Sequence, residues 1–487
     1  ARDEQKSQQP IDYQLNNIIN KAMNLASLKR KANGEKKVAI MFYNYPAGEK
    51  NASASFLNVP TSLASIFSTL KGAGYNVEEK QAPWFIDQTG LMLKPFHREL
   101  PYTELPGLGT PEGAGGLLPV AVYRGWYNTL PEATRNAIEA QWGQPEASFS
   151  VAEVDGKKQF IIPRVISGNI MVLPQPPRGN QQEQERAIYH DKSVPVSHNY
   201  LAVYLYAREQ FGADAIVHLG THGSHEYLPG KERGLSLYDA GNLTAGDTPI
   251  IYPFIMDDVG EALQTKRRGR ATVISHLTPP FAKSALYEGY VDLHELMHQY
   301  KELDEGGVKA RTQQSIIEGV EARNIHQDLA WKRADIEARF DEFLPELHNY
   351  LNDLGAQNQP LGLHTFGEIP HEEHLVSTLV QMLGKRFVQP AERYAEKQRE
   401  HVRANDHDSA VDYRTLNQSP EYQLIRTFVI GHATLDEIND DELRGLLKEA
   451  RVHYANFQNI EENSALLEAL SGQYVSSSNG GDPIRSP

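Results

Sequence analysis

The chain has 487 residues, of which 40% are hydrophobic, 23% charged and 9% aromatic, and its formal net charge is −15. This length exceeds one ordinary core, so two to four packed units are expected, and the acidic balance argues against a nucleic-acid partner, whose phosphates need a basic surface. No apolar run approaches the roughly 20 residues that span a bilayer, and the absence of cysteine excludes thiolate catalysis, disulfides and cysteine-ligated metal centres.

Residues 1–145 are predicted to form an α/β unit. A helix is expected over Ile11–Arg30, then a buried strand in KKVAIMFYNYP, then a helix that is capped by Thr61 and ends near Gly72. Another strand is expected after this helix, because strand, helix and strand is the order of a parallel sheet. The segment from about 81 to 116 is rich in proline and glycine and is predicted to be a lid or linker.

Residues 146–286 are predicted to form a second α/β unit, which carries the functional site. Strands are expected around the turn Asp155-Gly156, followed by a helix in NYLAVYLYAREQFG and by strands in ADAIVHLG, TPIIYPFIM and ATVISHLTPP. Residues 287–487 have a mainly helical pattern, with a loop at NQPLGLHTFGEIP. The predicted fold class is therefore α/β and multi-domain, with parallel or mixed sheets flanked by helices and a mainly helical C-terminal part.

The strand in ADAIVHLG leads into the segment VHLGTHGSHEYLPGK, which sets histidines and a glutamate among glycines. Ligands of open α/β sheets bind at the carboxyl ends of strands, and glycines let a bulky ligand approach the backbone. Imidazole and carboxylate groups bind divalent metals and also accept protons. We predict His222 and Glu226 as catalytic residues, with Glu226 in the first turn of a helix that begins near Ser224. The predicted metal ligands are His218, His222, His225 and Glu226, although His218 could equally be a satisfied core residue and His225 a surface one.

Several basic residues and one further histidine are candidates for binding an anionic ligand through charge-assisted hydrogen bonds. A solvated face is the commoner fate of such charged runs. The predicted substrate-binding residues are Lys231, Arg233, Lys266, Arg267, Arg268, Arg178 and His198.

A competing motif lies in the helical part of the chain. His294-Glu295-Leu296-Met297-His298 matches the H-E-x-x-H pattern of zinc proteases, in which two histidines bind zinc and the glutamate acts as a base. The sequence offers no identifiable third ligand, and the segment also fits an ordinary amphipathic helix. A zinc metalloprotease is therefore the less favoured alternative. No G-x-x-x-x-G-K-[ST] loop occurs in the sequence, so any ATP that the chemistry consumes has to be hydrolysed by a partner.

Several separate blocks of the sequence, in the family's order, resemble the large subunit of cobaltochelatase (CobN) and the porphyrin-binding H subunit of magnesium chelatase. Together they span almost the entire chain, which is far more specific than a single motif. The blocks are VAIMFYNYP with NVPTSLASIFSTLKGAGYNV, QPPRG with YHDKSVPVSHNYLAVYLYAREQFGADAIVHLGTHGSHEYLPGK, GEALQTKRRGRATVISHLTPP, GLHTFGEIP and GGDPIRSP.

The resemblance implies a chelatase subunit that binds a porphyrin or corrin ring and inserts a divalent metal, while two smaller AAA+ subunits hydrolyse ATP. It matches Glu226 and His222 to the family's glutamate and histidine in a THGSLE block. His225 departs from the family, which commonly has an apolar or small residue there, and an added imidazole can ligate iron. This departure suits the haem-associated HmuS-type branch, which is proposed to remove iron from haem. The metal is therefore cobalt, magnesium or iron, and a non-catalytic haem- or porphyrin-binding module is the alternative.

The resemblance also implies that the chain is a central portion of a longer protein, truncated at its C-terminus, because the family's large subunits continue past the GGDPIRSP block. Such a portion could be inactive alone. A cytoplasmic location is expected, with membrane association of the full-length protein and a periplasmic location left open.

Overall fold

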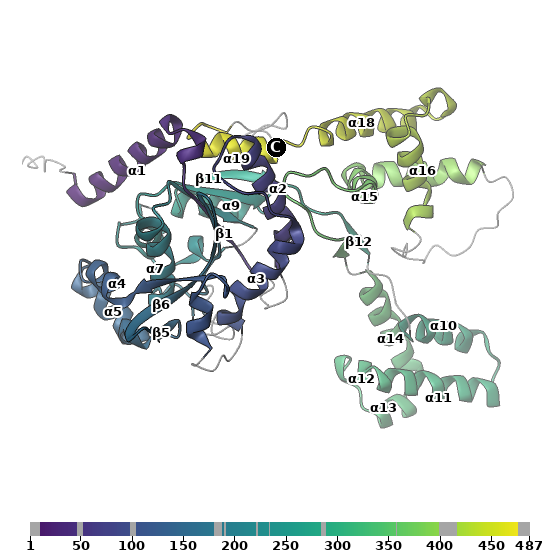
Figure 1. Cartoon of the computed structure of the whole chain (residues 1–487). Helices are drawn as coiled ribbons and strands as arrows, with labels where there is room; N and C mark the ends of the chain where they lie inside the picture. Colours follow the sequence, from purple (N-terminus) through teal and green to yellow (C-terminus); the bar gives the residue numbers. More distant parts are fainter. Residues whose placement is uncertain are drawn as a thin grey trace, which may run out of the picture. The chain divides into compact units, whose positions relative to one another are not determined.

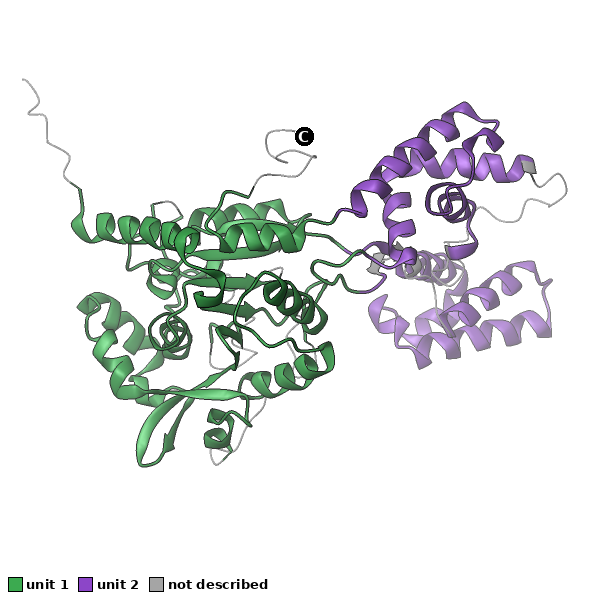
Figure 2. Ribbon diagram, turned by 45° about the horizontal axis from the view of Figure 1, so that its top comes forward, with its two compact units in different colours: residues 1–278, 363–369, 460–487 green, residues 279–362, 370–459 purple. Residues whose placement is uncertain are grey.

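The computed structural model describes residues 10–45, 52–97, 104–179, 188, 191–220, 223–232, 234–283, 289–356, 358–398 and 416–475. The chain folds into two compact units (Figure 2), and unit 1 consists of residues 1–278, 363–369 and 460–487, while unit 2 consists of residues 279–362 and 370–459. Unit 1 is α/β and unit 2 is mainly helical, so the predicted fold class is confirmed. The predicted domain boundaries stay a prediction.

Unit 1 is built on a six-stranded sheet with the strand order β11-β10-β9-β1-β8-β7, in which neighbours pair in parallel except β7 and β8. Successive side chains of the central strand β1 enter opposite cores, with Val38 and Ile40 on one face and Ala39 and Met41 on the other. A continuous apolar run of this kind is typical of a parallel strand that is covered on both faces. The strands are β1 (Val38–Phe42), β7 (Val165–Ser167), β8 (Ile170–Pro174), β9 (Ala215–Leu219), β10 (Ile250–Ile255) and β11 (Thr272–His276).

Helices cover both faces of this sheet. Helices α2 and α3 lie on one side of β1, and α4 and α7 lie on the other (Figure 1). The helices of unit 1 are α1 (Asp12–Arg30), α2 (Val59–Gly72), α3 (Ala82–His97), α4 (Val120–Tyr127), α5 (Glu132–Trp142), α7 (His198–Leu205), α8 (Ala240–Ala245), α9 (Val259–Arg268) and α19 (Glu462–Leu470). The described residues of unit 1 also form two smaller antiparallel sheets, β2 (Ser53–Ala54) with β3 (Leu57–Asn58), and β4 (Gly115–Pro119) and β5 (Val151–Val154) on either side of β6 (Lys157–Pro163).

Most predicted elements of unit 1 are confirmed, including helix α1 and strands β1, β9, β10 and β11. The predicted turn Asp155-Gly156 joins β5 to β6, and both residues have the positive φ angles that a tight hairpin turn requires. The predicted helix in NYLAVYLYAREQFG is α7, which continues as a π-helical turn over Tyr206–Gln210.

Three expectations for the N-terminal part are wrong. Helix α2 is capped by Asn58, whose side-chain oxygen accepts the backbone N–H of Thr61 at 3.3 Å, because the helix begins two residues earlier than the expected cap. Residues 75–81, directly after this helix, form no strand, and Val77 packs into the core instead. The expected lid or linker contains helix α3, because Phe85 and its helical neighbours pack against the sheet.

Unit 2 is mainly helical, as predicted for this part of the chain. Among the helices in the described part of the protein, none has both the length and the apolar character needed to cross a bilayer. The elements of unit 2 are β12 (Phe281–Lys283), α10 (Gly289–Glu302), α11 (Gly307–Ala322), α12 (Ile325–Asp328), α13 (Arg333–Ala338), α14 (Phe340–Ala356), β13 (Asn358–Pro360), α15 (Glu372–Leu383), α16 (Lys385–Gln398), α17 (Pro420–Leu424) and α18 (Asp441–Phe457).

Candidate active site at the carboxyl end of strand β9

The turn that follows β9 brings its side chains to the edge of the sheet where the parallel strands end. His222 lies outside the described residues. The segment after it forms a single 3₁₀ turn over His225–Tyr227, and not the helix that was expected to begin near Ser224. A Cβ atom on Gly223 would lie 1.9 Å from the Tyr252 hydroxyl, so only glycine fits beneath this side chain.

Glu226 is fully buried on this turn. The hydroxyl of Tyr252, from strand β10, donates to the carboxylate at 3.0 Å from Oε1 and 3.3 Å from Oε2. Burial disfavours the charged carboxylate and raises the pKa of Glu226 to about 8, although hydrogen bonds from the backbone and from Tyr252 partly oppose this. A carboxyl group with such a pKa exchanges a proton close to neutral pH, which suits a general acid or base.

His218, from strand β9, is buried against the ring of Tyr252. Its Nε2 lies 3.0 Å from the Tyr204 hydroxyl, and its ring centroid lies 5.2 Å from that of Tyr252. Its Nδ1 is buried and makes no hydrogen bond within the described part of the protein. Burial lowers the pKa of His218 well below its usual value, so the imidazole is neutral. A buried polar atom without a partner is rare and marks a position where a ligand could bind.

His225 is also buried, and its ring centroid lies 5.2 Å from that of His218. Its Nε2 lies 2.8 Å from the carbonyl oxygen of Gly241. Because a carbonyl only accepts hydrogen bonds, Nε2 carries the hydrogen and Nδ1 keeps the lone pair that could bind a metal. Burial lowers the pKa of His225 to about 4, which keeps this ring neutral at physiological pH.

A series of hydrogen bonds connects the turn to the end of β8, to helix α7 and to β9. The side chain of Gln175, which follows β8, accepts the backbone N–H of Ser224 at 3.0 Å and donates to the Tyr204 hydroxyl at 3.1 Å. Tyr204 in turn contacts His218, and Tyr200, one helical turn before Tyr204 on α7, bonds the Ser224 hydroxyl at 2.9 Å. These contacts hold the turn in one position relative to β9.

The predicted basic residues divide into exposed and buried ones. Lys231, Lys266 and Arg267 are exposed, while Arg233 lies outside the described residues. Arg268 is buried, and its Nη2 donates to the carbonyl oxygen of Leu228 at 2.5 Å. Arg268 thus supports the end of the turn, whereas the exposed residues are available to a ligand.

Arg178 and His198 are both buried, and their described contacts are within the protein. Arg178 donates from Nη2 to the carbonyl oxygen of Asp191 at 2.8 Å. The two ring nitrogens of His198 contact the Tyr123 hydroxyl at 2.8 Å and the carbonyl oxygen of Gly143 at 3.0 Å. Both nitrogens of His198 are therefore occupied, and we do not assign this residue to the site.

The sequence analysis missed the tyrosines that surround the predicted residues. Tyr204 and Tyr252 lie in apolar stretches that read as ordinary core, so their polar function is hidden in the pattern. The tyrosines in these buried stretches were themselves a signal, because a buried tyrosine hydroxyl usually has a polar partner. The alternation of strand β10 places Tyr252 and Phe254 on the same face, and both pack in one core cluster.

The described groups have the capacities that metal exchange in a ring ligand requires. Glu226, His218 and His225 are all buried, the two imidazole ring centroids lie 5.2 Å apart, and Tyr252 contacts both the carboxyl group of Glu226 and the ring of His218. Neutral imidazoles and a carboxyl group are ligands for borderline divalent metals, and the carboxyl group can also carry a proton.

The chain matches the CobN/Magnesium Chelatase family over residues 1–487. Among curated relatives, it is 32% identical to an uncharacterized protein of Methanocaldococcus jannaschii, over 96% of this chain and 38% of that protein. It is 31% identical to the aerobic cobaltochelatase subunit CobN of Sinorhizobium sp, over 77% of this chain and 28% of that subunit. It is 30% identical to the chloroplastic magnesium-chelatase subunit ChlH of Oryza sativa, over 75% of this chain and 25% of that subunit.

The fold is also similar to a solved structure, the catalytic subunit of cobaltochelatase from Mycobacterium tuberculosis. The TM-score is 0.69 at 26% sequence identity, and the match covers 94% of this chain and 39% of that one. The chain therefore spans between a quarter and two fifths of the length of these relatives.

Proposed function

Because the chain belongs to the CobN/magnesium chelatase family, we propose that it is part of a chelatase large subunit that binds a porphyrin or corrin ring and inserts or removes a divalent metal. The observation that carries this proposal is the buried Glu226, whose pKa is raised to about 8 and whose hydrogen-bond partner Tyr252 also packs against the ring of His218. Relatives named as cobaltochelatase and magnesium-chelatase subunits support the same chemistry.

Glu226 is the proton-transferring residue in this proposal. Metal insertion releases protons from the ring nitrogens, and metal removal returns protons to them, so one group has to accept or donate a proton in either direction. The pKa of about 8 keeps Glu226 protonated at neutral pH until a cation approaches, and a positive charge nearby favours the ionised carboxylate. The hydroxyl of Tyr252 holds both carboxylate oxygens in position.

The proposed metal ligands are His218, His222, His225 and Glu226. Nδ1 of His225 is the donor that the described geometry supports best, because its Nε2 carries the hydrogen. The buried Nδ1 of His218 is a donor in the tautomer whose Nε2 donates to Tyr204. Imidazole suits cobalt or iron better than magnesium, which prefers oxygen ligands. The residue His225, which departs from the family pattern, favours iron and metal removal, the reaction of the haem-associated branch.

Access to the site requires a local opening. Glu226, His218 and His225 are each at most 2% exposed, so a ring can contact them only after neighbouring groups move aside. The exposed Lys231, Lys266 and Arg267 are proposed to bind the carboxylates at the periphery of the ring, since they flank the turn without being used in the core.

ATP is proposed to act only through partner subunits of the AAA+ class, because the sequence contains no phosphate-binding G-x-x-x-x-G-K-[ST] loop. A cytoplasmic location is proposed together with these partners.

The test is an absorbance titration of the purified chain with haem, protoporphyrin and a metal-free corrinoid in parallel, followed by metal exchange into or out of the bound ring. We expect Glu226→Gln to bind the ring with an unchanged affinity and to lose metal exchange. Glu232→Gln, an exposed glutamate after the same turn, is the matched control and should keep both.

Two results would count against this role of Glu226. Loss of ring binding in Glu226→Gln would make the residue a binding group without a catalytic role, and unchanged exchange would remove it from the mechanism. A chain that binds a ring tightly but exchanges no metal even with partner subunits and reductant would instead be a haem- or porphyrin-binding module.

A further inference from the structure

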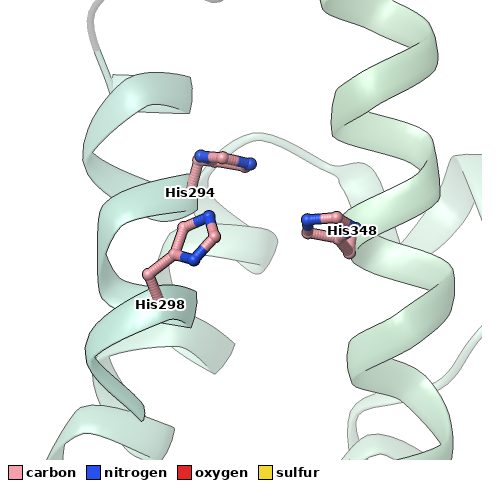
Figure 3. Close-up of side chains that lie close together, drawn as sticks. All are labelled: His294, His298 and His348. Carbon is pink, nitrogen blue, oxygen red and sulfur yellow. The ribbon is translucent and has the colours of Figure 1, made fainter. Parts of the chain in front are cut away.

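A second group of histidines lies in unit 2, on two facing helices. His294 and His298 are one turn apart on α10, and His348 comes from α14, with its ring directed toward the other two (Figure 3). One nitrogen from each ring lies within 4.8 Å of the other two. The ring centroids are 4.6 Å apart for His294 and His298, and 5.5 and 6.0 Å from these rings to His348.

The packing of the two helices explains this meeting of residues that are distant in the sequence. Leu293 and Met297 of α10 are buried in the same core cluster as Leu347 and Leu351 of α14. Each of these apolar residues is the neighbour in sequence of a histidine or lies one helical turn from one. This apolar contact holds the two helices together, so the histidines beside it lie near one another at partly or fully exposed positions.

We propose that His294, His298 and His348 form a binding site for a divalent transition-metal ion such as Zn²⁺ or Co²⁺. Zinc binds imidazole nitrogens at about 2.0–2.1 Å, so the ligand atoms of a tetrahedral site lie about 3.4 Å apart. The three nitrogens lie within 4.8 Å of one another, so a bound ion would have to draw them together by side-chain rotation. Three imidazoles favour borderline metals over Mg²⁺ or Ca²⁺, which prefer oxygen.

A neighbouring side chain can orient one of the ligands. The side-chain amide nitrogen Nδ2 of Asn352, one turn after His348 on α14, lies 3.2 Å from His348 Nδ1 and donates to it. A flip of this amide would place Oδ1 against Nδ1 instead, where it would accept the Nδ1 hydrogen and leave the lone pair on Nε2 for the metal. Hydrogen bonds of this kind from a second residue fix the ring orientation in many metal sites.

The proposed site provides the third ligand that was not identifiable for the H-E-x-x-H motif. Its three ligands leave one coordination position for water or another small ligand. A bound ion joins α10 to α14, and because it binds the folded helices, it stabilises unit 2 by mass action. The exposed Glu295 is not part of the proposed ligand set.

The test is titration of the metal-free chain with Co²⁺ and Zn²⁺, with Co²⁺ followed by its visible absorbance and Zn²⁺ by equilibrium dialysis. We expect His298→Gln and His348→Gln each to lower the affinity for the metal ion bound at this site by at least tenfold. His298 is exposed, so its variant should keep the helical circular dichroism of the parent. His371→Gln, an exposed histidine elsewhere in unit 2, is the control that should keep the parental binding of this metal ion.

Two further measurements separate a metal site from a structural effect of the histidines. Zn²⁺ should raise the melting temperature of unit 2 in the parent chain and not in His298→Gln, whereas Mg²⁺ should raise it in neither. Glu295→Gln should keep the metal. The proposal is overturned if His298→Gln and His348→Gln bind the same number of equivalents with parental affinity, or if Glu295→Gln loses the ion.

Discussion

Burial gives Glu226 an acid–base behaviour that differs from that of an exposed glutamate. Its pKa is raised to about 8 in the folded chain, while in the unfolded chain it has the ordinary value of about 4.3. At a pH between these two pKa values, Glu226 is ionised in the unfolded chain and protonated in the folded chain. The free energy of unfolding therefore falls as the pH rises through this window, and a neutral residue at position 226 would not have this cost.

We predict that Glu226→Gln stabilises unit 1 in a pH-dependent way. The gain in free energy of unfolding should be near zero below pH 4 and on the order of 3 kcal/mol at pH 7. Urea unfolding at several pH values, followed by tryptophan fluorescence, measures this gain. A Trp331→Phe background restricts the signal to unit 1, where the remaining tryptophans Trp84, Trp126 and Trp142 lie. The exposed control Glu232→Gln should give no such slope, and a pH-independent difference would contradict the raised pKa.

The short turn after β9 was only partly predictable from the sequence. The sequence predicted Glu226 and its histidine neighbours as site residues from their glycine-rich context. It could not predict the 3₁₀ turn, because the conformation depends on contacts with Gln175 and Tyr252, which come from other strands. Helix α3 was not predicted because the glycine and the prolines in its sequence indicated a loop. The apolar residues that stabilise this helix do so through contacts with the sheet, which the local pattern does not show.

Gly223→Ala tests whether the close contact beneath Tyr252 is needed. The added Cβ would lie 1.9 Å from the Tyr252 hydroxyl and 3.1 Å from a Glu226 oxygen, so the hydrogen-bonded group has to move. We expect a loss of about 1–3 kcal/mol in the stability of unit 1 and a fall of at least about tenfold in metal exchange, since small displacements of reacting groups are costly.

Gly90→Ala is the matched control for this substitution. Gly90 lies inside helix α3, and a Cβ there would meet nothing within 4 Å. It should stabilise the chain by about 0.5–1 kcal/mol because alanine favours a helix. If Gly223→Ala behaved like Gly90→Ala in urea unfolding and in metal exchange, the packing argument for this turn would be wrong.

Unit 1 is assembled from three separate stretches of the chain, between which the chain leaves to form unit 2. Glu462, at the start of α19, connects all three stretches. Its carboxylate accepts the backbone N–H groups of Leu277 at 2.8 Å and Gly367 at 2.6 Å, and the ring Nε2–H of His364 at 2.9 Å. The block around His364 is recognisable in the sequence, but no local pattern could pair it with Glu462, which lies 98 residues further along the chain.

Glu462→Gln should therefore weaken unit 1 as a whole. Three donors converge on an acceptor-only carboxylate, and glutamine replaces one oxygen by an NH₂ group that has to face a donor in either orientation. A buried donor left without an acceptor costs about 1–3 kcal/mol, so the tryptophan-reported unfolding of unit 1 should shift by that amount while the melting of unit 2 stays unchanged. Glu461→Gln, at the exposed neighbouring position, should shift neither. Equal destabilisation by both variants would show that the helix start, and not the convergence of the three stretches on Glu462, determines this contribution.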